Sequence, residues 1–400
     1  MATGCSKMDQ AQANNKSDLK ETSRPASEAR PSEAKKTENQ TDESAQDSKL
    51  KKKFASFKNW ASGLRWIPTS AEELQASEEK ILSYLKGKHK GYFVDIGEPK
   101  EDGCAEKGEA SKAKPENLKI WTLEMESTES TKLPLVLVHG FNLASALWVL
   151  NLDQLAEKRK VYAIDLLGFG RSSRPRFRKK ENPEMDLVDA IESWRKGVGL
   201  QKFDLLGHSF GGYVAAAYAI KHPGYLNRLI LLEPYGFSDK TDLMEKVPFW
   251  YKYSFKLMHM AKINPMAPMR VSGPLGKLLI SNQDELKKKF EPMLGAEARE
   301  ITNYLYHCNA LKASGELIFK QLCTSELNVK RPIILRASEF DPQIKLSIIY
   351  GQLSWIHKES EENLKKRFPA NQLDHKIIAE AGHHVYSDKP SELNSYINSL

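Results

Sequence analysis

The 400-residue sequence lacks the marks of a secreted or membrane-spanning protein. It contains no run of about 18 apolar residues, and its N-terminus, MATGCSKMDQ, has no apolar core of a signal peptide. Cysteine is scarce, and the four cysteines form no CxxC pair, which argues against a disulfide framework and a structural zinc site. We therefore expect a cytosolic protein with free thiols, no metal and no cofactor.

The sequence also lacks a recognisable nucleic-acid-binding module. Its formal net charge is +8, and the lysines are spread through Lys- and Glu-rich segments. A positive charge distributed in this way suits solubility or attraction to anionic lipid surfaces. We therefore expect no nucleic-acid partner.

Residues 1–50 contain almost no aromatic or branched apolar side chains. Such a segment cannot bury enough apolar surface to offset the entropy of ordering. It is predicted to be a disordered polar tail.

Residues 51–70, KKKFASFKNWASGLRWIPTS, form a short basic segment rich in aromatic residues. Phe57, Trp60 and Leu64 recur at roughly helical spacing, and lysines lie among them. Trp66 follows. Two interpretations are open: a helix that docks its apolar stripe on the following domain, or an interfacial lipid anchor, since Trp favours the headgroup boundary and Lys favours anionic lipid.

Residues 71–118 are predicted to hold a helix, around AEELQASEEKILSYL, and a polar linker. Residues 119–400 contain strand-like apolar runs, most of them followed by a helical pattern: KIWTL, LPLVLVHG, KVYAIDLLGFG, FDLLGHS, LILLEP, LSIIYG and HKIIAEAG. This alternation favours an α/β fold, a mostly parallel sheet with helices on both faces. An insertion at about residues 236–330, rich in Met, aromatic residues and Pro, is interpreted as a lid.

Residues 207–211, Gly-His-Ser-Phe-Gly, fit the G-x-S-x-G nucleophile elbow. The strand-like run FDLL precedes them and the helical stretch GYVAAAYAI follows, as the elbow requires. Glycines are needed because the tight turn leaves no room for side chains beside the serine. Ser209 is therefore the candidate nucleophile, and a purely structural turn is the alternative.

Two further segments supply an oxyanion site and a base. In LVLVHGFN, the backbone N–H of Phe141 would pair with that of Phe210 to hold an oxyanion. In AEAGHHVYSDKP, an exposed His after the last strand is the expected general base. Its position directly after Ala-Gly favours His383, and His384 is the alternative.

The orienting carboxylate is missing from the place where the chain order nucleophile, acid, base predicts it. After LSIIYG the chain runs QLSWIHKE, and its first carboxylate is Glu359. Two substitutes are open. Glu359 could reach back along its loop, and Glu233, at the end of LILLEP, could serve from a neighbouring strand.

From about residue 55 to the C-terminus the chain resembles α/β-hydrolase domain-containing proteins four and five. The matching segments include WIPTSAEELQASEEKIL, LVLVHGF, YAIDLLGFGRSSRPRF, LLGHSFGG, LLEPYGF, INPMAPMRVSGPLG, YLYHCNA and AGHHVYSDKP. The resemblance implies lipid chemistry at a membrane or droplet surface. One branch of the family comprises serine enzymes that act on lysophospholipids and N-acylphospholipids. The other is the droplet coactivator of a patatin-like triacylglycerol lipase, which has Asn at the nucleophile position and a Trp-rich N-terminal anchor.

The chain departs from the family pattern at the acid. The family's catalytic Asp falls on His357, and a basic residue of some members falls near Leu353. Because the family keeps a Glu at Glu233 beside its usual Asp, the resemblance suggests a structural role for Glu233. The spacing from His383 to Asp388 matches the H-x-x-x-x-D pattern for which the family has been described as lysophosphatidic acid acyltransferases.

The missing acid, and Trp60 and Trp66 at the position of the droplet anchor, favour the coactivator branch. The resemblance then implies a droplet protein that promotes triacylglycerol lipolysis by recruiting or activating a patatin-like triacylglycerol lipase. Expected partners are that lipase, the droplet surface or its coat proteins, and an acyl lipid. The expected location is the droplet surface and the cytosol, without a transmembrane segment. The alternatives are a slow serine hydrolase of lysophospholipids or N-acylphospholipids, which Ser209 and His383 favour, and a lysophosphatidic acid acyltransferase.

Overall fold

The computed structural model describes most of the chain from residue 69 onwards. The described residues are 69–98, 117–127, 129–177, 179–238, 256, 260–261, 263–272, 276, 284–356, 358–369 and 372–400. Outside them lie His357, the predicted tail and the four predicted anchor residues, Phe57, Trp60, Leu64 and Trp66.

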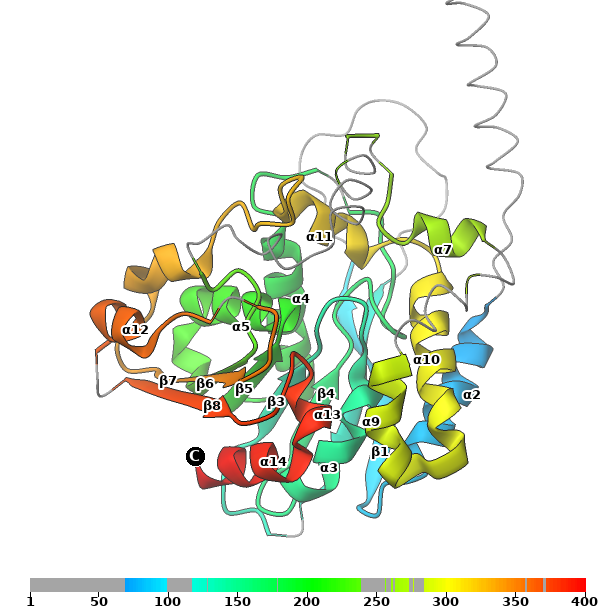
Figure 1. Ribbon diagram of the computed structural model, residues 1–400, viewed down its shortest axis with the longest axis horizontal. Helices are drawn as coiled ribbons and strands as arrows, with labels where there is room; N and C mark the ends of the chain where they lie inside the picture. Colours follow the sequence, from blue (N-terminus) through cyan, green and yellow to red (C-terminus); the bar gives the residue numbers. More distant parts are fainter. Residues whose placement is uncertain are drawn as a thin grey trace, which may run out of the picture. The chain divides into compact units, whose positions relative to one another are not determined.

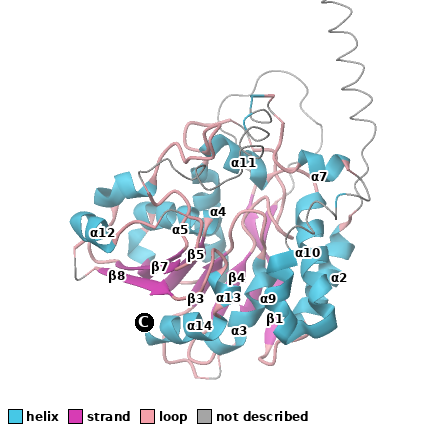
Figure 2. Ribbon diagram, in the orientation of Figure 1, coloured by secondary structure: helices cyan, strands magenta, loops and turns pink. Residues whose placement is uncertain are grey.

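Eight strands form one sheet at the centre of the described chain (Figure 2). They are β1 (His89–Gly97), β2 (Leu118–Met125), β3 (Leu135–Val138), β4 (Val161–Ile164), β5 (Phe203–His208), β6 (Leu226–Leu232), β7 (Lys345–Gly351) and β8 (Leu373–Ile378). Their order across the sheet is β1-β2-β4-β3-β5-β6-β7-β8. β2 pairs antiparallel with β1 and with β4, and the pairs from β4 to β8 are parallel.

Helices cover both faces of this sheet (Figure 1). They include α2 (Ala71–Leu82), α3 (Val149–Leu155), α4 (Glu184–Val198), α5 (Phe210–Lys221), α7 (Ala267–Val271), α9 (Asp284–Leu294), α10 (Arg299–Ala310), α11 (Gly315–Leu322), α12 (Glu361–Arg367), α13 (Val385–Asp388) and α14 (Pro390–Ser399). Successive residues of a strand point to opposite faces of the sheet and belong to two separate apolar layers, as Leu205 and Leu206 of β5 do. One layer includes α4, α5, α11 and α12, and the other includes α2, α3, α9, α10, α13 and α14. The predicted α/β fold is confirmed.

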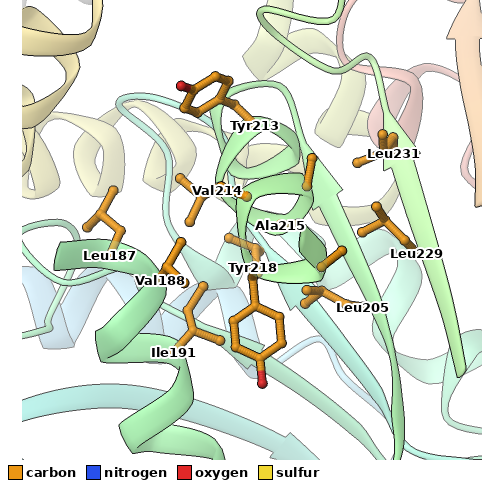
Figure 3. Packing of buried hydrophobic residues seen from close by; sticks show 14 of the residues in the cluster. Leu187, Val188, Ile191, Leu205, Tyr213, Val214, Ala215, Tyr218, Leu229 and Leu231 are labelled. Carbon is orange, nitrogen blue, oxygen red and sulfur yellow. The ribbon is translucent and has the colours of Figure 1, made fainter. Parts of the chain in front are cut away.

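Helix α5 packs closely between α4 and the sheet. Figure 3 shows Val214 and Tyr218 of α5 among Val188 and Ile191 of α4 and Leu205 of β5. All five of these side chains are essentially inaccessible to solvent. The helix that follows the candidate nucleophile is therefore fixed by packing along its length.

Residues 71–118 contain strand β1, which was not predicted, besides the predicted helix. It pairs with β2 from His89 opposite Met125 to Gly97 opposite Leu118. Only Val94 of this edge strand is buried, and its apolar stretch, Tyr92 to Val94, is short and lies between Gly91 and Asp95. The predicted helix is present as α2.

The predicted insertion at about residues 236–330 contains α7, α9, α10 and α11 in its described part. Helix α10 packs against α2, and the Tyr304 hydroxyl donates to Glu78 Oε2 at 3.1 Å. Helix α9 packs against α13, which directly follows the candidate base. The insertion is thus joined both to α2 and to the C-terminal part of the domain.

Candidate active site

Ser209 occupies a strained turn between β5 and α5. Its backbone has φ 53° and ψ −120°, a conformation with positive φ that a residue with a side chain rarely adopts. The turn is fixed on both sides, because Ser209 N donates to Leu232 O at 2.9 Å and Ser209 O accepts from Gly212 N at 2.9 Å. A Cβ on Gly211 would lie 2.3 Å from His139 O, so glycine is required where the elbow meets β3. This is the geometry expected of a nucleophile elbow.

His383 lies in the loop between β8 and α13, and its ring faces Ser209. The distance from His383 Nε2 to Ser209 Oγ is 3.1 Å. The Trp355 ring lies against the imidazole, with ring centroids 4.8 Å apart. His384 instead places its Nδ1 3.3 Å from the Tyr386 hydroxyl. Of the two predicted histidines, His383 is thus the one that contacts the candidate nucleophile.

Glu233 completes this arrangement from the residue that follows β6. Its Oε2 lies 3.3 Å from His383 Nδ1, and its side chain is fully buried. The end of β7 and the loop after it hold the carboxylate: Gly351 N donates to Oε1, and the Ser354 hydroxyl donates to Oε2. With its proton on Nδ1, the imidazole donates to Glu233 and accepts from Ser209. The three side chains thus form one hydrogen-bonded series.

Burial moves the pKa values of His383 and Glu233 in opposite directions. Burial, with a smaller contribution from the Lys289 cation, lowers the pKa of His383 to about 3. Burial raises the pKa of Glu233 to about 7, although hydrogen bonds from Ser354 and Gly351 oppose the change. Near neutral pH the imidazole is therefore neutral and able to accept a proton, and Glu233 is divided between carboxylate and carboxylic acid.

Glu359, the other predicted substitute acid, is directed away from the base. Its Oε1 accepts a hydrogen bond from Asn363 Nδ2 at 2.7 Å, and the side chain is buried. Among the described residues, no hydrogen bond or ion pair joins Glu359 to His383. The structure therefore brings Glu233, and not Glu359, to the imidazole.

The predicted oxyanion residues lie beside Ser209. Phe210 is the first residue of α5, where a backbone N–H has no acceptor within the helix. A Cβ on Gly140 would lie 3.1 Å from Ser209 Cβ, so the backbone just before Phe141 passes next to the serine. The Phe141 ring stacks on Phe319 of α11, with centroids 3.9 Å apart. The two backbone segments expected to bind an oxyanion are thus adjacent to the serine.

Three residues that the sequence did not single out support the series. Gly351 and Ser354 hold Glu233, as described above. His208, which directly precedes Ser209, places its Nε2 2.9 Å from the carbonyl oxygen of His383 and holds the backbone of the base. His208 could have been found from the sequence, because it lies inside the Gly-His-Ser-Phe-Gly motif. Ser354 could not, because its contact with Glu233 does not follow from spacing along the chain.

Asp388, the second residue of the acyltransferase-like motif, does not contact the imidazole through any hydrogen bond or ion pair of the described residues. Its Oδ2 accepts from Gly382 N at 2.8 Å, and its Oδ1 lies 2.6 Å from Lys289 Nζ. Asp388 therefore contacts the backbone next to His383 and a lysine of the insertion.

The described residues include no group of three or more His, Cys, Asp or Glu side chains placed to hold a metal ion. Within the same residues, no helix is both long enough and apolar enough to span a bilayer.

Comparison with known proteins places the chain among α/β hydrolases. A family model described as alpha/beta hydrolase fold matches residues 134–262. The Homo sapiens protein named 1-acylglycerol-3-phosphate O-acyltransferase ABHD5 is 38% identical over 337 residues, which cover 83% of this chain and 90% of the relative. The Homo sapiens (lyso)-N-acylphosphatidylethanolamine lipase is 34% identical over 337 residues, which cover 83% of this chain and 92% of the relative.

Solved structures share the fold at much lower identity. A bacterial membrane phospholipase A superposes with a TM-score of 0.56 at 19% identity, covering 88% of this chain and 97% of the other. The carboxylesterase CesB from Bacillus subtilis gives a TM-score of 0.53 at 15% identity, covering 82% of this chain and 97% of the other. These likenesses concern the fold alone.

The chain therefore belongs to the α/β-hydrolase family. Within it, the expected resemblance to α/β-hydrolase domain-containing proteins four and five is confirmed by the two human relatives.

Proposed function

We propose that this protein is a serine hydrolase of acyl lipids that uses Ser209, His383 and Glu233. The carrying observation is the continuous series from Ser209 Oγ to His383 Nε2 at 3.1 Å and from His383 Nδ1 to Glu233 Oε2 at 3.3 Å. The sequence has no carboxylate at the family's acid position, where His357 stands. Glu233, directly after β6, provides a carboxylate beside His383 instead.

The geometry supports acyl transfer through a covalent intermediate. Ser209 Oγ attacks the acyl carbonyl carbon while its proton passes to His383 Nε2, and Glu233 stabilises the resulting imidazolium. The carbonyl oxygen becomes an oxyanion that the N–H groups of Phe141 and Phe210 bind. His383 then protonates the departing alcohol or amine. A water oxygen then attacks the acyl carbon while one water proton passes to His383. The bond between that carbon and Ser209 Oγ breaks, His383 returns the proton to Oγ, and the fatty acid leaves.

The relatives suggest the substrate class. The names of the two human relatives refer to an acylglycerol phosphate and to an N-acylated phosphatidylethanolamine. Both are acyl lipids that carry a phosphate, so we assign lysophospholipids and N-acylphospholipids as the substrates to test first. Acyl transfer to lysophosphatidic acid would use the same acyl-enzyme, with an alcohol in place of water.

A droplet-bound coactivator of a patatin-like triacylglycerol lipase is the second candidate. Two observations favour it. The pKa of Glu233, raised to about 7, leaves part of the acid protonated at neutral pH and weakens the catalytic series. The predicted anchor residues Trp60 and Trp66 suit attachment to a droplet surface. In this function the hydrolase domain serves as a binding surface for the lipase.

The deciding experiment measures fatty-acid release by the purified full chain and by its Ser209→Ala variant. The substrates are lysophosphatidylcholine, N-acylphosphatidylethanolamine and a triacylglycerol emulsion, the last with and without a patatin-like lipase. We expect release from a phospholipid that disappears in Ser209→Ala. Stimulation of the lipase that survives Ser209→Ala, with no release by the chain alone, would contradict the hydrolase and support the coactivator.

A further inference from the structure

One ion pair joins the loop of His383 to the insertion, and the proposed chemistry does not itself use it. Asp388 is the last residue of α13. Its Oδ2 accepts from Gly382 N at 2.8 Å, while its Oδ1 pairs with Lys289 Nζ of α9 at 2.6 Å. A single carboxylate therefore fixes the backbone directly before the base and a lysine from another part of the chain.

Two other hydrogen bonds restrain this loop, one on each side of Gly382. Ala381 O accepts from Leu353 N at 2.8 Å, and His383 O lies 2.9 Å from His208 Nε2. Gly382 has no side chain with which to pack, and a Cβ there would lie 3.3 Å from Asp388 Oδ2. The peptide unit between Ala381 and Gly382 is thus held at both ends, by Leu353 N at its carbonyl oxygen and by Asp388 at its N–H, which is the end next to His383.

We propose that Lys289 and Asp388 form a clasp that positions His383 for proton transfer, with Asp388 acting through the Gly382 N–H. This inference rests on the proposed hydrolase function. A carboxylate is a stronger acceptor than a neutral group. The Asp388 side chain is only 12% exposed, and Lys289 compensates its charge. The H-x-x-x-x-D spacing then places Asp388 where it holds the backbone next to the base, and Asp388 takes part in no chemical step.

The clasp also makes the base sensitive to the position of α9. Lys289 belongs to the insertion at about residues 236–330, and α9 packs against α13. A displacement of α9 is transmitted through Asp388 to Gly382, and so to the imidazole 3.1 Å from Ser209 Oγ. Because misplacement of a reacting group by about 1 Å can cost about 100-fold in rate, the contact couples the insertion to catalysis.

The test measures how fast an alkyl fluorophosphonate labels Ser209 in the full chain. In this reaction Ser209 Oγ bonds to phosphorus, fluoride leaves and His383 takes the serine proton, so the rate reports the serine and base without a lipid substrate. The variants are Asp388→Ala, Asp388→Asn, Lys289→Met and the charge-swapped pair Lys289→Asp with Asp388→Lys. Lys287→Met is the matched control, because it removes another lysine of α9, whose ion pair in the described part of the chain is with Glu291 at 3.7 Å.

We expect Asp388→Ala to slow labelling about 100-fold. Asp388→Asn keeps an acceptor for the Gly382 N–H and slows it about tenfold, as does Lys289→Met. The charge-swapped pair stays as slow as Asp388→Ala, because a lysine cannot accept from Gly382, and Lys287→Met labels like the unaltered chain. Thermal unfolding checks that each variant folds. If Asp388→Ala does not fold, the single variants Asp388→Asn and Lys289→Met provide the test.

Two results would overturn the clasp while leaving the proposed function intact. In the first, the folded Asp388 and Lys289 variants label at the rate of the unaltered chain. In the second, the charge-swapped pair recovers that rate, which would show a simple ion pair with no role for Gly382. An unaltered chain that the probe never labels would overturn the hydrolase function itself, and the clasp with it.

Discussion

The loops after β6 and β7 exchange the roles that the chain order predicts for them. In that order the loop after β7 supplies the acid, and β6 supplies none. Here Glu233, directly after β6, reaches His383, while Gly351 at the end of β7 and Ser354 of the loop after it only donate hydrogen bonds to Glu233. The carboxylate that reaches His383 Nδ1 thus comes from the strand next to the one that the chain order predicts.

The exchange has an electrostatic consequence. Glu233 is fully buried, and its pKa is raised to about 7. Ser354 and Gly351 oppose that change, so hydrogen bonds from the end of β7 and from the loop after it keep the acid ionised in part.

Loss of the nucleophile should have the largest effect. Ser209→Ala removes the atom that attacks the acyl carbon, and we expect fatty-acid release to fall about 10⁶-fold, to the level of the remaining binding and oxyanion contributions. Titration of released fatty acid from lysophosphatidylcholine measures this. Activity that persists in the variant would place the nucleophile elsewhere.

Loss of the charge after β6 should have the next largest effect. Glu233→Gln keeps the shape of the side chain but cannot stabilise the imidazolium, and we expect kcat to fall about 10⁴-fold. Glu359→Gln is the matched control, because that carboxylate bonds Asn363 and not the base. Steady-state kinetics on one lysophospholipid compare the two. Equal losses in both variants would refute the assignment of the acid.

The raised pKa of Glu233 predicts a pH dependence. The active form is the carboxylate, so activity rises as the pH increases through the pKa of about 7. His383, whose pKa is lowered to about 3, stays a neutral base throughout this range. We expect kcat to rise about tenfold from pH 6 to pH 8 and then level off. A profile that falls over this interval would contradict the account.

Removal of one donor from the loop after β7 should have the smallest effect. The Ser354 hydroxyl lowers the pKa of Glu233, so Ser354→Ala should move the midpoint of the pH profile up by about one pH unit. The rate at pH 7 then falls about fivefold, and the rate at high pH recovers. A uniform loss at every pH would indicate a packing role for Ser354 instead.

Much of this fold was predictable from local patterns. The strands from β3 to β7 follow from apolar runs that alternate with helices, because a parallel sheet buries both faces of its central strands. Ser209 was predictable because the elbow needs small residues at fixed places around it. Strand β1 was not, since its apolar stretch, Tyr92 to Val94, is short and only Val94 of this edge strand is buried.

The acid could not be chosen from sequence alone. Glu359 is nearer the expected position along the chain, whereas Glu233 is nearer to His383 in space. That proximity depends on how β6, β7 and β8 lie side by side and on two donors, Gly351 and Ser354, that turn the carboxylate toward the imidazole. Spacing along a chain gives the order of such groups but not their distances.

The most direct test of the central claim is the low-field proton NMR signal of His383 Nδ1–H at a pH above the pKa of Glu233. A proton held between an imidazole and a carboxylate resonates far downfield of other N–H protons. We predict such a signal in the unaltered chain and in Glu359→Gln, and its loss in Glu233→Gln. A signal that persists in Glu233→Gln and disappears in Glu359→Gln would contradict the account.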